Sequence, residues 1–92
     1  MAYRVELSTS AGKELRKLKK RIQPRIMQSI GERISALADD PRPPGVEKVK
    51  GHDNLWRVRA DKDYRIVYTV QDDVLLVVVV KIGHRREVYR EF

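Results

Sequence analysis

The sequence predicts an α+β fold: an N-terminal strand, a helical hairpin and then three antiparallel strands. Three observations support this prediction: a short alternating segment, two stretches with apolar residues at helical spacing, and three β-rich runs after a proline-rich turn. The length of 92 residues predicts one domain that spans residues 1–92.

The first element is expected to be a strand, because residues 3–7 alternate between apolar and polar side chains. Ser8, Thr9 and Ser10 then supply hydroxyls of the kind that cap a helix. Four apolar residues follow at helical spacing and predict one buried face: Ala11, Leu15, Leu18 and Ile22. Pro24 suits the first turn of a second helix. The apolar stripe of that helix is Ile26, Ile30, Ile34 and Leu37.

Three prolines within residues 41–44 end the helical region, since proline lacks an amide donor and fixes φ. Three β-rich runs follow, at residues 55–60, 65–70 and 74–82, and short polar links of hairpin type separate them. The last run is apolar at almost every position. This pattern predicts a strand that is buried on both faces and lies inside the sheet.

The chain is basic: 20 Lys and Arg outnumber 13 Asp and Glu, for a formal net charge of +7. Most of the excess lies in residues 11–25, where seven cationic side chains accompany one glutamate. Such a surface favours a polyanionic partner, either nucleic acid or an acidic protein segment. A helix face that merely contacts solvent is the alternative.

No segment has the pattern of an export signal or a membrane anchor. The longest apolar run, residues 74–80, is much shorter than the about 20 residues that a membrane-spanning helix needs. The absence of cysteine excludes disulfides and thiolate metal sites, and it fits a reducing compartment. We therefore expect a cytoplasmic protein.

Three arginines are expected on one face of the sheet. Arg57 and Arg59 alternate with apolar residues in one strand, and successive side chains of a strand point to opposite faces. Arg65 opens the next strand in the same phase. Guanidinium groups at this density repel one another unless an anion lies among them, and phosphate matches their geometry. Surface ion pairs with Asp61 and Asp63 are the alternative.

Taken in order, these features resemble the RelE/ParE bacterial toxins, specifically the RelE-like messenger-RNA interferases. The resemblance covers essentially the whole chain. It rests on the element order and on four motifs: Lys-Val-Lys-Gly at 48–51, Trp-Arg-Val-Arg at 56–59, Asp-Tyr-Arg-Ile-Val-Tyr at 63–68, and the closing segment 82–90. It implies a four-stranded sheet in which the first strand lies beside the last. It also implies two partners: the small ribosomal subunit with mRNA, and a cognate RelB-like antitoxin.

The resemblance implies roles for individual residues. Five positions match catalytic places of the family: Arg57, Arg59, Arg65, Arg85 and Tyr89. The first two stand where the best-known members carry lysine, and arginine holds its proton too tightly to act as a base. His84 is therefore a sixth catalytic candidate, for proton transfer, and a solvent-facing hinge residue is the alternative. Contacts with RNA and the ribosome are expected from Lys13, Lys17, Lys20, Lys48, Lys50 and Arg86.

The implied activity is ribosome-dependent cleavage of mRNA in the decoding site, and it needs neither a metal ion nor another cofactor. The 2′-hydroxyl of the substrate attacks the adjacent phosphate, which gives a 2′,3′-cyclic phosphate and a 5′-hydroxyl. Two other functions remain open: a ParE-like toxin that inhibits gyrase, and an RNA-binding module without catalysis.

Overall fold

The computed structural model describes residues 2–89, so Arg90 of the closing motif lies outside the described residues. The elements follow in this order: β1 (Arg4–Leu7), α1 (Thr9–Lys19), α2 (Pro24–Ala36), β2 (Glu47–Lys48), β3 (Trp56–Ala60), β4 (Tyr64–Gln71), the short 3-10 helix η1 (Asp72–Val74) and β5 (Leu76–His84). This order confirms the expected α+β class. No helix among residues 2–89 is long and apolar enough to cross a membrane.

The described part of the chain forms one sheet with the strand order β1-β5-β4-β3-β2. β1 runs parallel to β5, which confirms that the first strand lies beside the last, and the other neighbours are antiparallel. The expected number of four strands was wrong. Glu47 and Lys48 add a fifth strand opposite Arg57 and Trp56, and two residues are too few to show an alternating pattern. Gly51, with φ of +86°, lies in the turn that follows.

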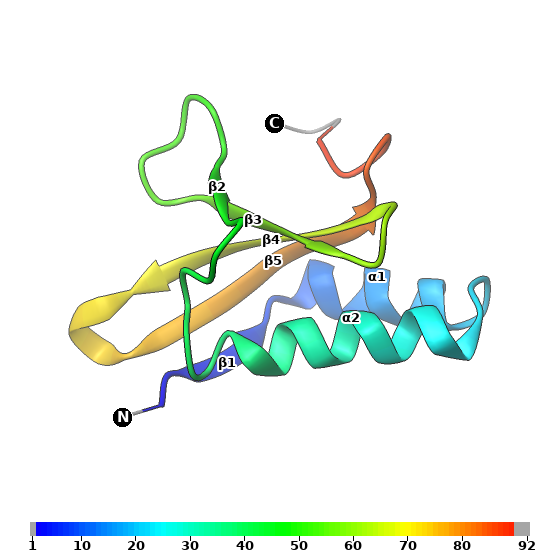
Figure 1. Ribbon diagram of the computed structural model, residues 1–92, viewed down its shortest axis with the longest axis horizontal. Helices are drawn as coiled ribbons and strands as arrows, with labels where there is room; N and C mark the ends of the chain where they lie inside the picture. Colours follow the sequence, from blue (N-terminus) through cyan, green and yellow to red (C-terminus); the bar gives the residue numbers. More distant parts are fainter. Residues whose placement is uncertain (1, 90–92) are drawn as a thin grey trace.

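Both helices cover the same face of the sheet (Figure 1). The Ser8 side chain caps α1 by accepting a hydrogen bond of 3.0 Å from the amide of Ala11, and Pro24 begins α2, as expected from the sequence. The core between helices and sheet is apolar, and its residues include Ile30, Leu37, Val58, Ile66, Tyr68, Val77, Val79 and Ile82. Each such aliphatic side chain contributes about 1.5–3 kcal/mol when it leaves water.

A second, smaller core lies on the opposite face, beneath the loop before β3 and the turn after β5 (Figure 1). Its buried residues are Val49, Leu55, Val67 and Val88. β5 lies between β1 and β4 and carries a bulge: Val67 pairs with Lys81 but Tyr68 pairs with Val79, so Val80 is an extra residue. The strand therefore packs against both cores, as its continuous apolar run predicted.

A polar cluster ties the loop after α2 to the rest of the fold. Arg42 donates two hydrogen bonds to the carboxylate of Asp72, at 3.0 and 2.8 Å, and the Tyr3 hydroxyl donates a third at 2.6 Å. These bonds hold the pKa of Asp72 at about 2. The buried Tyr68 hydroxyl donates to the carbonyl of Pro41 at 2.7 Å, and burial raises its pKa to about 12.

Candidate active site

An open cavity of about 350 Å³ lies on the sheet face that the helices leave uncovered, and most of the predicted catalytic residues line it. Its lining residues are Glu47, Arg57, Arg59, Arg65, Arg85, Arg86 and Tyr89. We call this site the arginine cavity. Five arginines and one glutamate make the cavity strongly cationic. It forms on this face because side chains alternate along a strand, so the polar residues point away from the core under the helices.

β3 and β4 place three of these arginines together. Arg57 and Arg59 alternate with Val58 and Ala60, which are buried in the main core. Arg59 pairs directly with Arg65 across the two strands. The guanidinium of Arg65 is held by nearby backbone: Nη1 donates to the carbonyl oxygens of Lys62 and Tyr64, at 3.1 and 2.9 Å. The period-two pattern of the sequence thus brings these arginines to one face.

Glu47 enters the cavity from the short edge strand β2. Its Oε2 accepts a hydrogen bond of 2.8 Å from Nη2 of Arg57, and the two residues are register partners. This bond lowers the pKa of Glu47 and raises that of Arg57. The carboxylate closest to the β3 arginines is therefore Glu47. Asp61 instead lies 3.4 Å from Arg25 of α2, and Asp63 lies 3.4 Å from Arg85.

The turn after β5 supplies the remaining residues of the cavity. The amide of Arg85 donates to the carbonyl of Asp63 at 2.7 Å, which fixes the start of the turn against β4. The ring of Tyr89 lies 5.2 Å from the guanidinium carbon of Arg57, at stacking distance. Its hydroxyl is buried and has no hydrogen-bond partner among the described residues. Arg86, which we expected to contact RNA or the ribosome, also lines the arginine cavity.

His84 does not line the arginine cavity. It lies in a separate groove of about 480 Å³ formed by α1, the end of β5 and the back of the same turn. Its ring packs edge-on against Tyr64, with 5.6 Å between centroids, and its Nδ1 accepts a hydrogen bond of 3.2 Å from the amide of Arg86. Of the six catalytic candidates, the structure brings five together and leaves this one apart.

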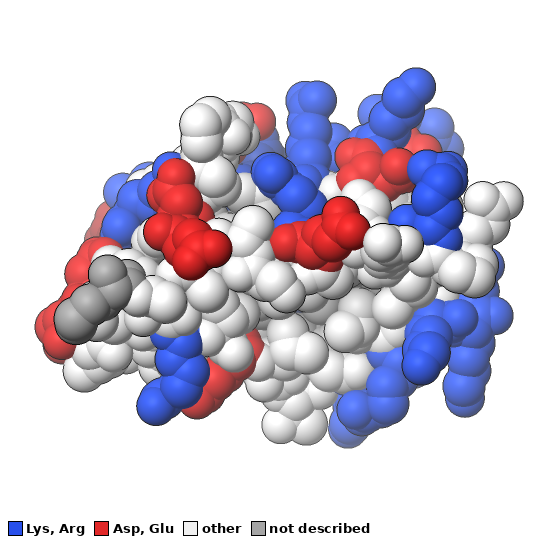
Figure 2. All heavy atoms as spheres, turned by 60° about the horizontal axis from the view of Figure 1, so that its bottom comes forward, with Lys and Arg blue, Asp and Glu red and all other residues white. Residues whose placement is uncertain are grey.

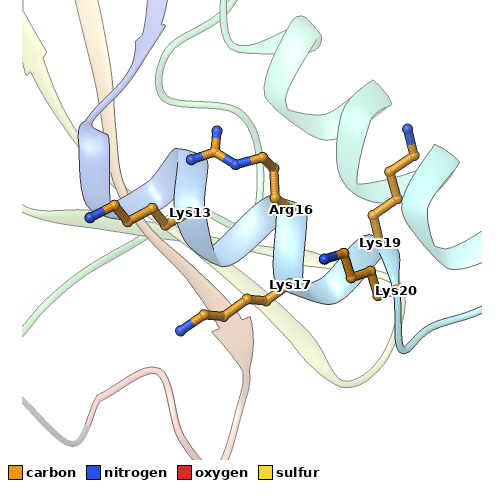
Figure 3. A pocket seen from close by; sticks show the side chains of 5 residues that line it. All are labelled: Lys13, Arg16, Lys17, Lys19 and Lys20. Atoms are coloured by element: carbon orange, nitrogen blue, oxygen red, sulfur yellow. The ribbon is translucent and has the colours of Figure 1, made fainter.

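The basic residues of α1 form a distinct surface. Lys13, Lys17 and Lys20 line a shallow hollow together with Arg16 and Lys19 (Figure 3). Figure 2 shows Lys and Arg side chains gathered at the right-hand end of the molecule, where Figure 1 places the connection between the two helices. Lys48 lies elsewhere, with its Nζ 5.3 Å from the ring centroid of Trp56, and Lys50 is exposed in the following turn.

Comparison with known proteins identifies the family. A family model described as the ParE toxin of the type II toxin–antitoxin system parDE matches residues 5–89. The chain belongs to this toxin family. It is thus a toxin of the RelE/ParE superfamily, as the sequence motifs had suggested.

The relatives of this toxin include RelE-like proteins. A protein of Escherichia coli described as a RelE-like toxin is 31% identical over 86 residues, which cover 92% of this chain and 85% of that protein. The archaeal RelE–RelB complex of Pyrococcus horikoshii OT3 contains a chain with a TM-score of 0.75 and 25% identity, covering 96% of this toxin and 100% of that chain. The E. coli DinJ–YafQ complex, with a TM-score of 0.80 over 97% of this chain and 99% of the other, shares the fold at 15% identity.

Glu47 is the residue of this toxin's cavity that reasoning from the sequence missed. It stands ten positions before its partner Arg57, on the far side of a glycine-containing turn. That turn signal, followed outward in both directions, would have paired the two residues as a hairpin. β2 has two residues, so neither its length nor an alternating pattern could predict it.

Proposed function

We propose that this toxin is an endoribonuclease that cleaves mRNA in the A site of translating ribosomes, without a metal ion. The observation that carries the proposal is the arginine cavity, where five arginines, one glutamate and one tyrosine line about 350 Å³. Guanidinium groups bind phosphate through paired hydrogen bonds. A phosphodiester is therefore the ligand that best suits this set of side chains.

Charge stabilisation falls to the arginines. Attack by the 2′-hydroxyl creates a phosphorane with two negative charges, and fixed cations aimed at developing charge usually supply the largest catalytic effect. Arg65 is anchored to two carbonyl oxygens, and Arg57 lies against the Tyr89 ring, so both are held in place when substrate arrives. Arg85 lies nearest the leaving 5′-oxygen in this proposal and stabilises its charge until water supplies the proton of the 5′-hydroxyl. The exposed Arg59 contacts the neighbouring phosphate.

Glu47 is our choice for the proton acceptor. Arginine cannot serve because it does not lose its proton near neutral pH. The bond from Arg57 keeps the pKa of Glu47 below its ordinary value of 4.5, so the carboxylate is ionised at neutral pH. A phosphate that binds Arg57 competes with this bond. Release from Arg57 would raise the pKa of Glu47 and make it a stronger base at the moment of attack.

His84 is the alternative proton carrier. It could act only if the turn after β5 rearranged, since the imidazole now lies in the groove beside α1 and its Nδ1 accepts the Arg86 amide. The two assignments are separated by substitution, because only the residue that takes the proton is needed for that step.

The ribosome would supply what the small cavity lacks. The cavity is open and cannot enclose a nucleotide, so an ordered mRNA must be presented to it. The basic hollow of α1, with Lys48 and Lys50, provides cations for contact with ribosomal RNA. The site of action would then be the cytoplasm, where ribosomes translate.

A RelB-like antitoxin is the proposed protein partner. The structures of RelE from P. horikoshii and E. coli include complexes with RelB. The net charge of +7 on this toxin favours an antitoxin with acidic segments.

The test is a defined translation system in which transcript ends are mapped after the toxin is added. We expect cuts in frame with the ribosome, with 5′-hydroxyl ends, and none in free mRNA. A phosphorothioate at the scissile phosphate should slow cleavage without rescue by Cd²⁺, since no metal would contact that atom. Intact mRNA with DNA cleaved in a gyrase assay would replace this proposal by the ParE-like alternative. Binding of RNA with no cleavage would leave the non-catalytic module.

A further inference from the structure

Glu14 differs from every other charged residue of α1. It is the one carboxylate in a helix that carries Lys13, Arg16, Lys17 and Lys19. Its side chain is only 32% exposed, and it lies against the end of β5. Neither the resemblance to toxins nor the proposed chemistry gives this residue a role.

The carboxylate of Glu14 takes the place of a strand partner. β1 pairs with β5 only as far as Leu7 opposite Val79, so within residues 2–89 the rest of that edge of β5 has no neighbouring strand. Beyond Leu7, other groups of the chain form hydrogen bonds to this edge of β5. The Ser8 amide donates to the carbonyl of Val79 at 2.8 Å, and Oε1 of Glu14 accepts the amide of Ile82 at 3.0 Å. Ile82 is 1% exposed, so its amide has no access to water.

The bond is formed just after the bulge of β5, where the ladder of hydrogen bonds is locally disrupted. A strand that slips by one residue turns every side chain to the opposite face. The pairs that follow the bulge, Ile66 with Ile82 and Arg65 with Gly83, lead directly into the turn that carries Arg85. The position of Arg85 beside Arg65 therefore depends on the register at Ile82. Nζ of the largely buried Lys81 lies 4.0 Å from Oε2 of Glu14, which adds charge attraction at the same point.

We propose that Glu14 is a positioning residue of the arginine cavity. Its bond to Ile82 holds β5 in the bulged register and so places the turn after β5 against β4. It thereby links the basic helix, which is our proposed ribosome contact, to the phosphate site on the other face of the sheet. The proposal rests on the proposed function for its measurement of cleavage, but its measurements of register and of anion binding are independent of it.

The test compares Glu14→Ala, which removes the acceptor, with Glu14→Gln, which keeps a neutral oxygen. Glu32→Gln is the matched control, because it removes the same charge from an exposed position on α2, where the carboxylate accepts a hydrogen bond from Gln28. Three quantities are measured well below the melting temperature of each variant. They are the exchange rate of the Ile82 amide, the affinity for inorganic phosphate followed by NMR of the arginine Nε groups, and the single-turnover cleavage rate at saturating ribosomes.

We expect Glu14→Ala to exchange the Ile82 amide at least about 10-fold faster. Phosphate affinity and cleavage rate should each fall about 10-fold, because the displaced arginines no longer fit the phosphate. Glu14→Gln should lie between Ala and the parent, and Glu32→Gln should match the parent. Faster Ile82 exchange with unchanged phosphate affinity and cleavage in both Glu14 variants would overturn the proposal and leave a purely structural contact.

The proposal stays testable if a variant fails to fold or if the parent protein shows no activity. If Glu14→Ala does not fold, Glu14→Gln decides alone, because it retains a hydrogen-bond acceptor. If the parent neither binds phosphate nor cleaves mRNA, the proposed function fails. The positioning role is then judged by the Overhauser contact between the Hα atoms of Ile66 and Ile82, which must weaken in the Glu14 variants and persist in Glu32→Gln. An undiminished contact would refute it.

Discussion

At the scale of single residues, the arginines differ in what their guanidinium groups already contact. Arg65 donates to two backbone carbonyls, Arg57 lies against the Tyr89 ring, and Arg59 is exposed. An arginine whose orientation is fixed by the protein loses less conformational freedom when phosphate binds. Arg65 and Arg57 are accordingly the side chains best prepared to meet a developing negative charge.

The first prediction concerns charge stabilisation. Arg65→Ala and Arg85→Ala should each lower the single-turnover cleavage rate by about 10²-fold, the size expected for removing one donor to the transition state. Ribosome affinity, measured by cosedimentation, should stay within about threefold of the parent, since the basic hollow of α1 is intact. Arg4→Ala, at an exposed residue paired with Glu6, is the control and should cleave at the parent rate. Equal rates in all three variants would remove the arginine cavity from the mechanism.

The second prediction separates the two proton carriers. Glu47→Gln should lower the cleavage rate by at least about 10²-fold, because an amide cannot accept the proton. His84→Gln should match the parent in rate and in pH profile between about pH 6 and 8, because the imidazole lies outside the cavity. The measurement is the single-turnover rate across that range. A flattened pH profile in His84→Gln, with Glu47→Gln unaffected, would reverse the assignment.

The sequence was informative about the site wherever strand geometry alone decides direction. Arg57, Arg59 and Arg65 could be assigned to one face because side chains alternate along any strand. His84 could not be placed, since the bulge at Val80 changes the alternation of β5 and the chain then turns back on itself. Glu47 depended on a two-residue strand. The positions of His84 and Glu47 depend on tertiary contacts, which produce no periodic pattern in the sequence.

At the scale of elements, local chemistry explains which boundaries could be predicted. The Ser8 cap and Pro24 mark helix starts that the structure confirms. The last strand was expected to begin at Val74 but begins at Leu76, because η1 intervenes and Leu75 adopts a positive φ of +51°. Val74 is 60% exposed, so its apolar character did not indicate burial. An apolar run reports hydrophobicity but not where the backbone turns.

The third prediction concerns the polar cluster that joins η1 to the loop after α2. Hydrogen bonds from Arg42 and Tyr3 lower the pKa of Asp72 from 3.8 to about 2 in the folded protein. The ionised carboxylate therefore stabilises the fold above about pH 4, and this contribution is lost as the pH falls towards 2. Asp72→Asn should unfold more easily than the parent near neutral pH. The difference between their urea midpoints should shrink between about pH 4 and 2.

High salt gives a check on the same cluster, because the groups are exposed and screened. The difference in urea midpoint between Asp72→Asn and the parent should be smaller at 1 M salt than at low salt. Asp73→Asn, which changes the neighbouring charge in η1, is the control and should show no comparable loss. A difference that persists undiminished at about pH 2 would contradict the assigned pKa.

At the scale of the whole molecule, two cationic surfaces lie on opposite sides of the sheet: the basic hollow on α1 and the arginine cavity. The fourth prediction separates their roles. Replacing Lys13, Lys17 and Lys20 by glutamine should weaken ribosome binding at least about 10-fold at low salt and reduce the salt dependence, because fewer counterions are released. The cleavage rate at saturating ribosomes should be unchanged. The same three positions changed to arginine keep the charge and should bind like the parent; a loss there too would point to shape and not charge.

The fifth prediction treats the toxin as half of a pair. Induction of this chain alone should arrest growth, whereas induction together with a neighbouring reading frame that encodes a RelB-like protein should permit it. The physical reason is that the arginine cavity lies open on the surface of the isolated chain, so activity persists until a partner binds. The measurement is growth after induction, with the two proteins recovered as a complex.

A toxin with both Arg65→Ala and Arg85→Ala is the decisive comparison for that experiment. It removes two cations of the cavity but leaves both hydrophobic cores intact, so the chain should still fold and still be recovered with the partner. If arrest results from cleavage, cells should tolerate this variant without any partner. If arrest persists at full strength, the harm comes from binding by the folded surface, and the gyrase-directed alternative gains the support that the nuclease loses.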